Sequence, residues 1–217
     1  MSMTMAQLTQ AMQDYLANAE TSFVNNIPIM VRQTEQRIYN SVQLPVMRKP
    51  SSGLQTSATV RTVTAPVDLL APYELFIVDA SNIRHAVINK DMSWMWEAFP
   101  NPTVTGMPDF YAMQDAATIC FSRIPDQTYP IELTYYAYPT SLVDVMPGNT
   151  TWLSQYYDSV LLYGCLVEGY IYLKGEPDLI QAYDTKFKEG LNLLKQLGDG
   201  KDRQDTYRDM QTKVKVN

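Results

Sequence analysis

The feature that most constrains the fold is a long apolar segment at residues 152–174. On a helical wheel its apolar side chains cover most of the circumference: Trp152, Tyr156, Val160, Leu161, Tyr163, Leu166, Val167, Tyr170, Ile171 and Leu173. A helix that is apolar on nearly all sides is buried among other elements. The sequence therefore predicts a helical core with this segment at its centre, beginning after a cap within Asn149 to Thr151.

Three further segments have helical spacing and can cover the central one. Residues 4–19 begin with Thr4 and Gln7 in the spacing of a capping box. Residues 26–42 present an apolar stripe after Pro28, which suits the first turn of a helix with Asn26 as its cap. After Gly175, a candidate left-handed terminator, a stripe of apolar residues from Leu179 to Leu194 predicts an antiparallel fourth helix. Together these segments predict a four-helix bundle.

Residues 44–148 have a different pattern, with dense proline, serine and threonine and short apolar runs. Five runs predict strands, at residues 58–66, 73–80, 83–91, 117–125 and 129–139. In the last run Ile131, Leu133 and Tyr135 alternate with polar residues, so one face is expected to point inward. Residues 91–102 interrupt the strands as a helical turn or a loop.

The predicted fold is therefore α+β, a four-helix bundle with an antiparallel β domain inserted between helices two and three. The expected parts are bundle helices one and two in residues 1–43, the inserted β domain in 44–148, bundle helices three and four in 149–198, and a C-terminal arm in 199–217. A chain of 217 residues is long enough to bury a sizeable core without a metal or disulfide.

Charge and composition narrow the function. The net charge of −6 argues against non-specific wrapping of nucleic acid, because neutralising phosphates needs clustered lysine and arginine, yet it suits a channel wall along which DNA slides. The 15 tyrosines indicate either surfaces that are buried against partners or a tyrosine-rich core.

The N-terminal residues lack the pattern of a signal peptide, and no run of about 18 uncharged apolar residues is present. We expect synthesis and folding in the cytoplasm and no contact with a membrane.

Catalytic signatures are sparse. His85 is the only histidine, which removes most Ser-His-Asp and Cys-His systems and leaves too few ligands for zinc, so a hydrogen-bonded strand histidine is the favoured interpretation. Cys120 and Cys165 lie in apolar stretches and are expected to be buried free thiols. No glycine-rich phosphate loop is present. We therefore predict no catalytic residue, no metal and no cofactor.

Two features leave alternatives open. Glu168, in the apolar helix, could act as a general acid of a hydrolase, but a surface carboxylate or an ion pair with Arg32 or Arg37 is favoured. The aromatic stretch with Trp94, Trp96 and Phe99 could stack on sugar or nucleic acid, lie in a subunit contact, or pack under a loop. Packing is favoured because no basic cluster neighbours these residues in the sequence.

The chain resembles the head-to-tail adaptor proteins of short-tailed bacteriophages over most of residues 5–197. Three stretches carry the resemblance: "LPVMRKPSSG" (44–53), "TVTAPVDLLAPYELFIVD" (62–79) and "WLSQYYDSVLLYGCLVEGYIYLKGEPDLIQAYDTKFKEGLNLLK" (152–195). The resemblance implies a structural virion protein without enzymatic activity. It would form a ring, usually of twelve subunits, between the portal and the nozzle or tail fibres, and line the DNA exit channel.

The resemblance also implies partners and contact residues. The expected partners are further copies of the chain, the portal protein and a nozzle or tail-fibre protein, with DNA only as passing cargo. The expected portal contacts are Tyr207, Arg208, Met210, Lys213 and Lys215. The expected subunit contacts are Tyr156, Tyr157, Tyr163, Tyr170 and Tyr183, and the candidate tail-side contacts are Trp94, Trp96 and Phe99. The competing hypotheses are a tail-associated peptidoglycan or polysaccharide hydrolase and a bundle that binds small ligands or lipids.

Overall fold

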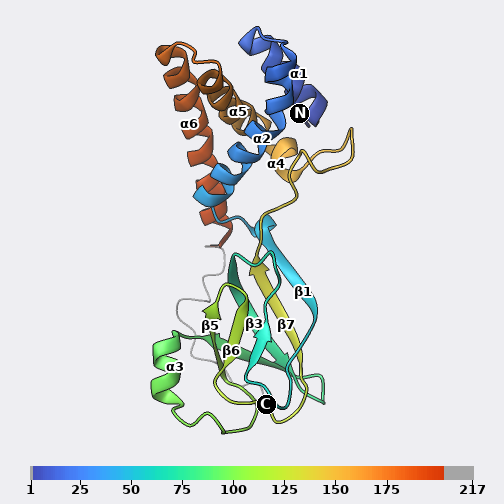
Figure 1. Cartoon of the computed structure of the whole chain (residues 1–217), viewed down its shortest axis with the longest axis vertical. Coiled ribbons are helices and arrows are strands. Elements are labelled where there is room, and N and C mark those ends of the chain that lie inside the picture. The colour runs from blue at the N-terminus through green and yellow to red at the C-terminus, as the bar shows by residue number, and fades with distance from the viewer. Residues whose placement is uncertain (1, 203–217) are drawn as a thin grey trace. The chain divides into compact units, whose positions relative to one another are not determined.

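A computed structural model describes residues 2–202 of the chain (Figure 1). The chain forms two compact units. One, here the β unit, consists of Val46–Tyr138, and the other, here the helical unit, combines Met1–Pro45 with Pro139–Asn217.

The helical unit is built around one central helix. Its described helices are α1 (Met5–Leu16), α2 (Thr21–Ser41), α4 (Trp152–Tyr156), α5 (Asp158–Tyr172) and α6 (Pro177–Asp202). All four of the others pack against α5, which confirms the central position that its apolar wheel predicts. The capping box of Thr4 and Gln7 at the start of α1 is also confirmed, as is the cap at Thr151 before α4.

Glycines allow the helices of this unit to approach closely. A Cβ atom on Gly164 of α5 would lie 2.4 Å from Thr34 Cγ2 on α2 and 2.9 Å from the Phe187 ring on α6. A Cβ on Gly190 of α6 would lie 2.7 Å from Val160 Cγ2 on α5. These positions require glycine for packing, because the next helix occupies the space of a side chain.

Three local predictions for the helices are wrong. The predicted helix at 152–174 is interrupted at Tyr157, whose φ of −137° and ψ of 41° lie outside the helical region and separate α4 from α5. Helix α2 begins at Thr21, so Asn26 is not its cap and Pro28 lies inside it rather than in its first turn. The left-handed residue after α5 is Lys174, with φ 54°, and not Gly175.

The β unit is a curled sheet of seven described strands in the order β1-β7-β3-β4-β5-β6-β2 (Figure 1). The strands are β1 (Arg48–Gln55), β2 (Thr62–Thr64), β3 (Ala71–Val78), β4 (Arg84–Asn89), β5 (Phe110–Asp115), β6 (Thr118–Phe121) and β7 (Pro130–Tyr136). Its core includes Ile131, Leu133 and Tyr135, which confirms the inward face predicted from their alternation.

Two of these strands and one connection were not predicted. Strand β1 contains Pro50 and Gly53, two residues that usually interrupt strands, but it is an edge strand with an irregularity beside Gly53, where both are tolerated. Strand β5 pairs in parallel with β4, and the short helix α3 (Met92–Ala98) lies in the connection between them. A parallel pair requires such a crossover, whereas a tight hairpin joins only antiparallel strands.

The predicted architecture is therefore wrong, although its α+β class is right. The described residues form six α-helices and a curled mixed sheet, not a four-helix bundle with an inserted antiparallel β domain. The error has two physical sources. The backbone break at Tyr157 adds a helix to the helical unit, and the crossover through α3 makes one strand pair parallel.

Candidate interaction surfaces

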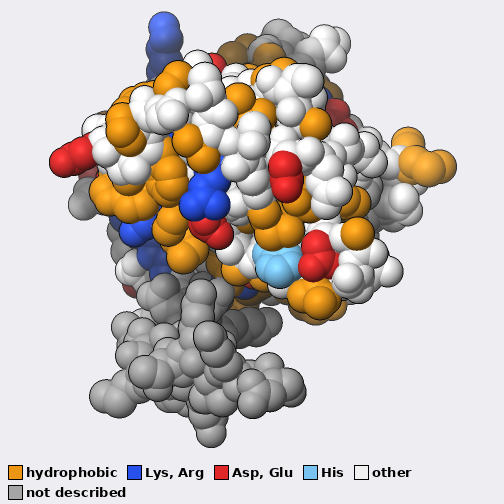
Figure 2. All heavy atoms as spheres, turned by 90° about the horizontal axis from the view of Figure 1, so that it is seen from below, with side chains coloured by type: hydrophobic (Ala, Val, Ile, Leu, Met, Phe, Trp, Pro, Cys, Tyr) orange, Lys and Arg blue, Asp and Glu red, His pale blue; other side chains and the backbone are white. Residues whose placement is uncertain are grey.

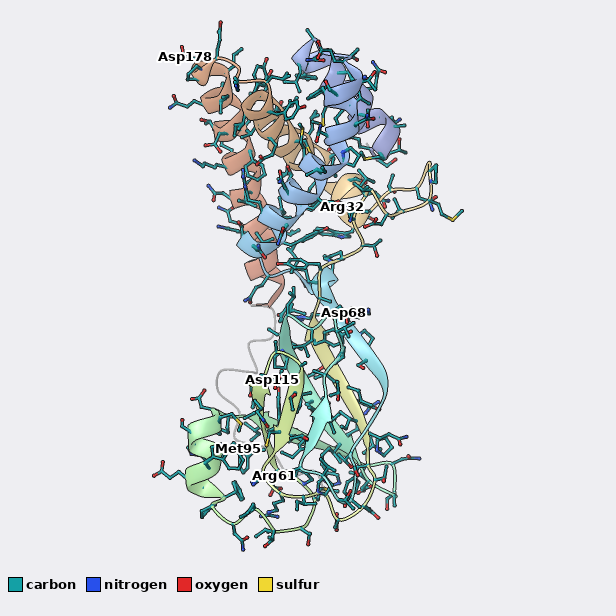
Figure 3. All side chains as sticks on the ribbon, viewed as in Figure 1. Arg32, Arg61, Asp68, Met95, Asp115 and Asp178 are labelled. Carbon is teal, nitrogen blue, oxygen red and sulfur yellow. The ribbon has the colours of Figure 1, made fainter. Side chains whose placement is uncertain are left out.

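A segment that follows the β unit is fastened to α2 by two carboxylates. The guanidinium of Arg32, labelled in Figure 3, donates two hydrogen bonds to Asp144, at 2.8 and 2.6 Å. The buried carboxylate of Glu35 accepts a hydrogen bond of 2.9 Å from the backbone N–H of Leu142. Burial raises the pKa of Glu35, while hydrogen bonds from Ser141 and Leu142 oppose the shift. Residues 141–144 are therefore held against the helix.

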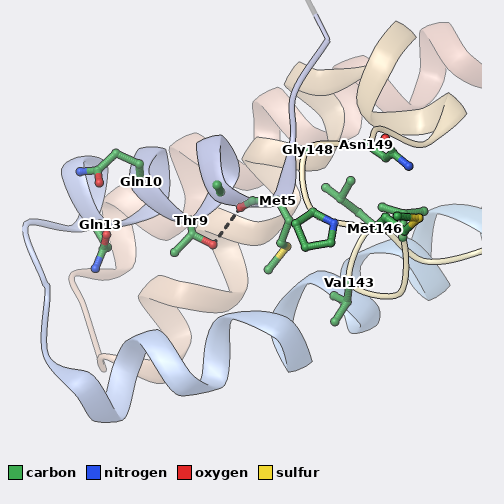
Figure 4. Close-up of a pocket in the computed structure, with 12 residues that line it drawn as sticks. Met5, Thr9, Gln10, Gln13, Val143, Met146, Gly148 and Asn149 are labelled. Atoms are coloured by element: carbon green, nitrogen blue, oxygen red, sulfur yellow. Dashed lines mark hydrogen bonds between the residues drawn. The ribbon is translucent and has the colours of Figure 1, made fainter.

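Beyond this attachment the same segment forms one wall of a groove in the helical unit (Figure 4). The groove, here the α1 groove, has a volume of about 440 Å³. Its other wall is the outer face of α1, with Met5, Thr9, Gln10 and Gln13. The twelve described lining residues include no Asp, Glu, Lys or Arg. The groove therefore suits an apolar occupant with neutral polar neighbours.

Three of the five tyrosines predicted as subunit contacts lie together within one chain. Tyr183 of α6 stacks on Tyr163 and Tyr170 of α5, with ring centroids 6.1 and 5.4 Å apart, and meets the edge of Tyr15 of α1 at 6.5 Å. Burial, followed by the neighbouring Tyr170, raises the pKa of Tyr183. This tyrosine cluster is half-buried, so it combines packing inside the subunit with an accessible edge.

The other two tyrosines, Tyr156 and Tyr157, directly precede α5. Both contact Trp152, at ring-centroid distances of 6.1 Å for Tyr156 and 5.2 Å for Tyr157. Tyr156 is 63% exposed, whereas Tyr157 is half-buried at the break between α4 and α5. Tyr156 is therefore the one of the five with the most surface free for a partner.

The aromatic residues of the β unit cluster around α3. Trp94 packs against Phe99 and Phe110, with centroid distances of 6.2 and 5.1 Å, and the two phenylalanines are 6.0 Å apart. Trp94 and Trp96 keep exposed faces, at 37% and 48%. Packing within the unit thus accounts for part of this cluster, but both tryptophans remain accessible.

Each ring of the predicted tail-side set has a cation over it. Lys90 Nζ lies 5.1 Å from the Trp94 ring. The guanidinium carbons of Arg61 and Arg123 lie 5.1 Å from Trp96 and 5.8 Å from Phe99. These distances are within the range of cation–π attraction. The basic residues that the sequence lacks beside the aromatic stretch are therefore supplied by the fold.

We call Lys90, Arg61 and Arg123 with their three rings the cation–aromatic patch. Lys90 could have been recognised, because it lies only four residues before Trp94 in the sequence. The arginines could not, since Arg61 lies 33 residues before Trp94 and Arg123 lies 24 residues after Phe99. Arg61 is fixed by hydrogen bonds to the carbonyls of Phe121 and Ser122. Figure 3 shows Arg61 at the same end of the β unit as Met95 of α3.

The end of the β unit that faces the viewer in Figure 2 has a largely hydrophobic and polar surface with few charged side chains. Exposed apolar residues in the loops and edges of the unit include Val60, Ile83 and Val104. The pale blue residue is His85, the only histidine of the chain. Its Nε2 lies 2.9 Å from Asp79, which confirms the prediction of a partnered strand histidine.

The carboxylate considered for a hydrolase is paired. Arg37 Nη2 lies 2.5 Å from Glu168 Oε1, and the Glu168 side chain is only 13% exposed. This ion pair is one of the two that the sequence favours. Both cysteines are buried free thiols, as predicted, and burial raises the pKa of Cys165 to about 12, which keeps it unreactive.

Two kinds of feature are absent from residues 2–202. No group of three or more His, Cys, Asp or Glu side chains there has the arrangement to hold a metal ion. Among the helices of the same region, none has the length and apolar character to cross a membrane.

The chain matches the model of one known protein family. The model of a family described as SU10 adaptor protein matches residues 3–213, nearly the whole chain. The chain belongs to the SU10 adaptor family. The match confirms the resemblance to phage head-to-tail adaptors that the sequence motifs indicate. No curated protein matches the chain.

Membership in the SU10 adaptor family identifies a structural component of a phage virion. It implies a role in joining other virion proteins rather than in catalysis. The residues expected to contact a portal, Tyr207, Arg208, Met210, Lys213 and Lys215, lie outside the described residues. The other expected contacts lie in the helical unit for the tyrosines and in the β unit for the aromatic residues.

Proposed function

We propose that this SU10 adaptor forms a ring at the head-to-tail junction, docks on the portal and lines the channel through which DNA leaves the head. The single observation that carries the proposal is the family match over residues 3–213. The net charge of −6 supports the channel, because an acidic wall does not retain DNA. The ring is expected to contain twelve subunits, and it would be complete without a cofactor or metal.

The contacts are proposed as follows. Residues 199–217 bind the portal, with Tyr207, Arg208, Met210, Lys213 and Lys215 as contact residues. Neighbouring subunits contact each other through the tyrosines of the helical unit, and the exposed ring of Tyr156 supports this. The cation–aromatic patch contacts a nozzle or tail-fibre protein. The exposed Trp and half-buried Arg side chains support that role, because both residue types are enriched at the energetic centres of protein interfaces.

The experiment that tests this function combines mass photometry with negative-stain imaging of the chain, alone and with the portal ring from the same genome. The expected result is a ring, or a portal that gains about one adaptor per portal subunit, as matched rotational symmetry requires. A folded chain that neither assembles nor binds the portal would overturn the proposal.

The portal contact is tested separately with charge reversals. Arg208→Glu together with Lys213→Glu should weaken portal binding, whereas Lys195→Glu, an exposed lysine of α6, should not. Equal binding by all three proteins would refute the assignment of residues 199–217 to the portal. It would leave the adaptor function itself standing.

A further inference from the structure

The helical unit has an apolar surface on α6 that no other part of the described chain covers. Leu193 is 65% exposed and Leu197 is 37% exposed. They lie one helical turn apart, so their side chains project from the same side of the helix. Exposed leucines at this spacing, here the α6 leucine pair, form a short ridge.

The position of the ridge relates it to the tyrosine cluster. Lys186 lies seven residues before Leu193, two turns along the same side of α6. Its Nζ is 5.5 Å from the centroid of the Tyr163 ring. The leucine pair and the accessible edge of the tyrosine cluster therefore belong to one face of the helical unit.

The α1 groove is the surface of this unit whose chemistry matches the ridge. Its apolar lining includes Met5, Val143, Met146 and Pro147, and Met146 is 74% exposed. Methionine side chains are flexible and adapt to an inserted apolar group. Asn192 and Gln196 lie beside the leucines on the exposed side, Glu189 lies one turn before Leu193, and the groove has neutral polar residues on its rim. Insertion of the two leucine side chains themselves would bury no charge.

The two surfaces lie on different sides of the helical unit. Figure 1 shows α6 along one side of the unit, while the loop before α4, which carries Val143 and Met146, projects on the other. Because the two surfaces lie apart, the ridge cannot fill the groove of its own chain. Between two copies, the same pair of surfaces would give a head-to-tail contact that can repeat around a closed ring.

We propose that the α6 leucine pair of one subunit inserts into the α1 groove of the next. This inference rests on the proposed ring, and it names the surfaces that close it. The occupant of the groove is a second copy of this chain, with Leu193 and Leu197 against Met146 and Val143.

The first test is a cysteine cross-link between copies. A chain with both Leu193→Cys and Met146→Cys should give a ladder of disulfide-linked multimers on mild oxidation, because each subunit joins two neighbours. Either single variant should give no ladder. The wild type is the control for Cys120 and Cys165, which are buried. A ladder that depends on both new cysteines supports the contact, and its absence from a wild-type-like ring overturns it.

The second test measures assembly, alone and on the portal ring. Leu193→Glu and Met146→Glu should each raise the concentration for half-assembly by about tenfold or more, as expected for the loss of an interface hot spot. Ile29→Glu is the matched control, because Ile29 is 54% exposed in the same unit but belongs to neither surface. Leu193→Lys combined with Met146→Glu should restore part of the assembly. Folding of each variant is checked by circular dichroism.

The outcomes separate the two proposals. If the wild type assembles and the glutamate variants assemble equally well, the contact is wrong and the ring function stands. If the folded wild type stays monomeric both alone and with the portal, the ring and this contact are both refuted.

Discussion

Replacing Gly164 with alanine should destabilise the helical unit, although alanine is the better helix former. The new Cβ would lie 2.4 Å from Thr34 Cγ2 and 2.9 Å from Phe187 Cε2. Thr34 is 1% exposed and β-branched, so its methyl group cannot move aside without a shift of α2. Overpacking costs about 1–3 kcal/mol, and a clash this close places the cost in the upper part of that range, at about 2–3 kcal/mol. The gain in helix propensity returns about 1 kcal/mol. We expect a net loss of about 1–2 kcal/mol.

Gly169→Ala in the same helix is the matched control. Its Cβ would meet Leu16 Cδ1 at 2.6 Å, but the next atom is 3.6 Å away. The Leu16 methyl is the end of a flexible side chain on the last residue of α1 and can rotate away. We expect Gly169→Ala to be neutral, or to gain up to about 1 kcal/mol from helix propensity. The two variants should therefore differ by about 2 kcal/mol.

The assay is chemical denaturation followed by the helical circular dichroism signal, because that signal reports chiefly on the helical unit. Thr34→Ser removes the methyl group that blocks the new Cβ and keeps the hydroxyl. In a double-mutant cycle, Thr34→Ser and Gly164→Ala should show a favourable coupling of at least about 0.5 kcal/mol. Equal stability of the Gly164→Ala and Gly169→Ala variants, or no coupling with Thr34→Ser, would refute the reasoning.

Three more predictions concern charge and aromatic contacts. Because the pKa of Glu35 is raised in the folded state, its contribution to the stability of the fold is complete below about pH 4.5 and falls as the pH rises through the raised value. Glu35→Gln keeps an acceptor for the Leu142 N–H and should reduce the difference in melting temperature between pH 5 and pH 8; an unchanged difference would contradict this. The pKa of Asp68 is lowered by Lys49, so the contribution of Asp68 to the stability of the fold is complete above about pH 4 and is lost as the pH falls through the lowered value. In thermal melts, Asp68→Asn should flatten the acid end of the profile of stability against pH, and a profile like that of the wild type would count against the pairing with Lys49. Trp96→Ala should weaken capture of the tail-side protein by assembled rings without changing ring mass, and normal capture would remove the cation–aromatic patch from that contact.

Local signals in the sequence predicted the local structure well. The capping box at Thr4 and the burial of Ile131, Leu133 and Tyr135 depend on residues within a few positions of each other. The central position of α5 follows from its apolar wheel for the same reason. Pairing of Glu168 with Arg37 was within reach because both lie on predicted neighbouring helices.

The misses arise where distant segments decide the outcome. Nothing local distinguishes a parallel β4–β5 pair from an antiparallel one, since the direction depends on the path of the chain through α3. Strand β1 has Pro50 and Gly53 and forms only because it can add to the edge of the sheet beside β7. Likewise, the break at Tyr157 lies within a segment whose apolar residues keep helical spacing on both sides.

The sequence by itself determined the α+β class, the central helix and, through the order of its motifs, the adaptor family. The tertiary structure alone decided which cations cover which rings, as with Arg61 on Trp96, and where an uncharged groove and an exposed leucine ridge lie. Caps and apolar faces depend on neighbours along the chain, so they can be read from spacing. Surfaces are assembled from segments that meet only after folding, and their chemistry therefore depends on packing.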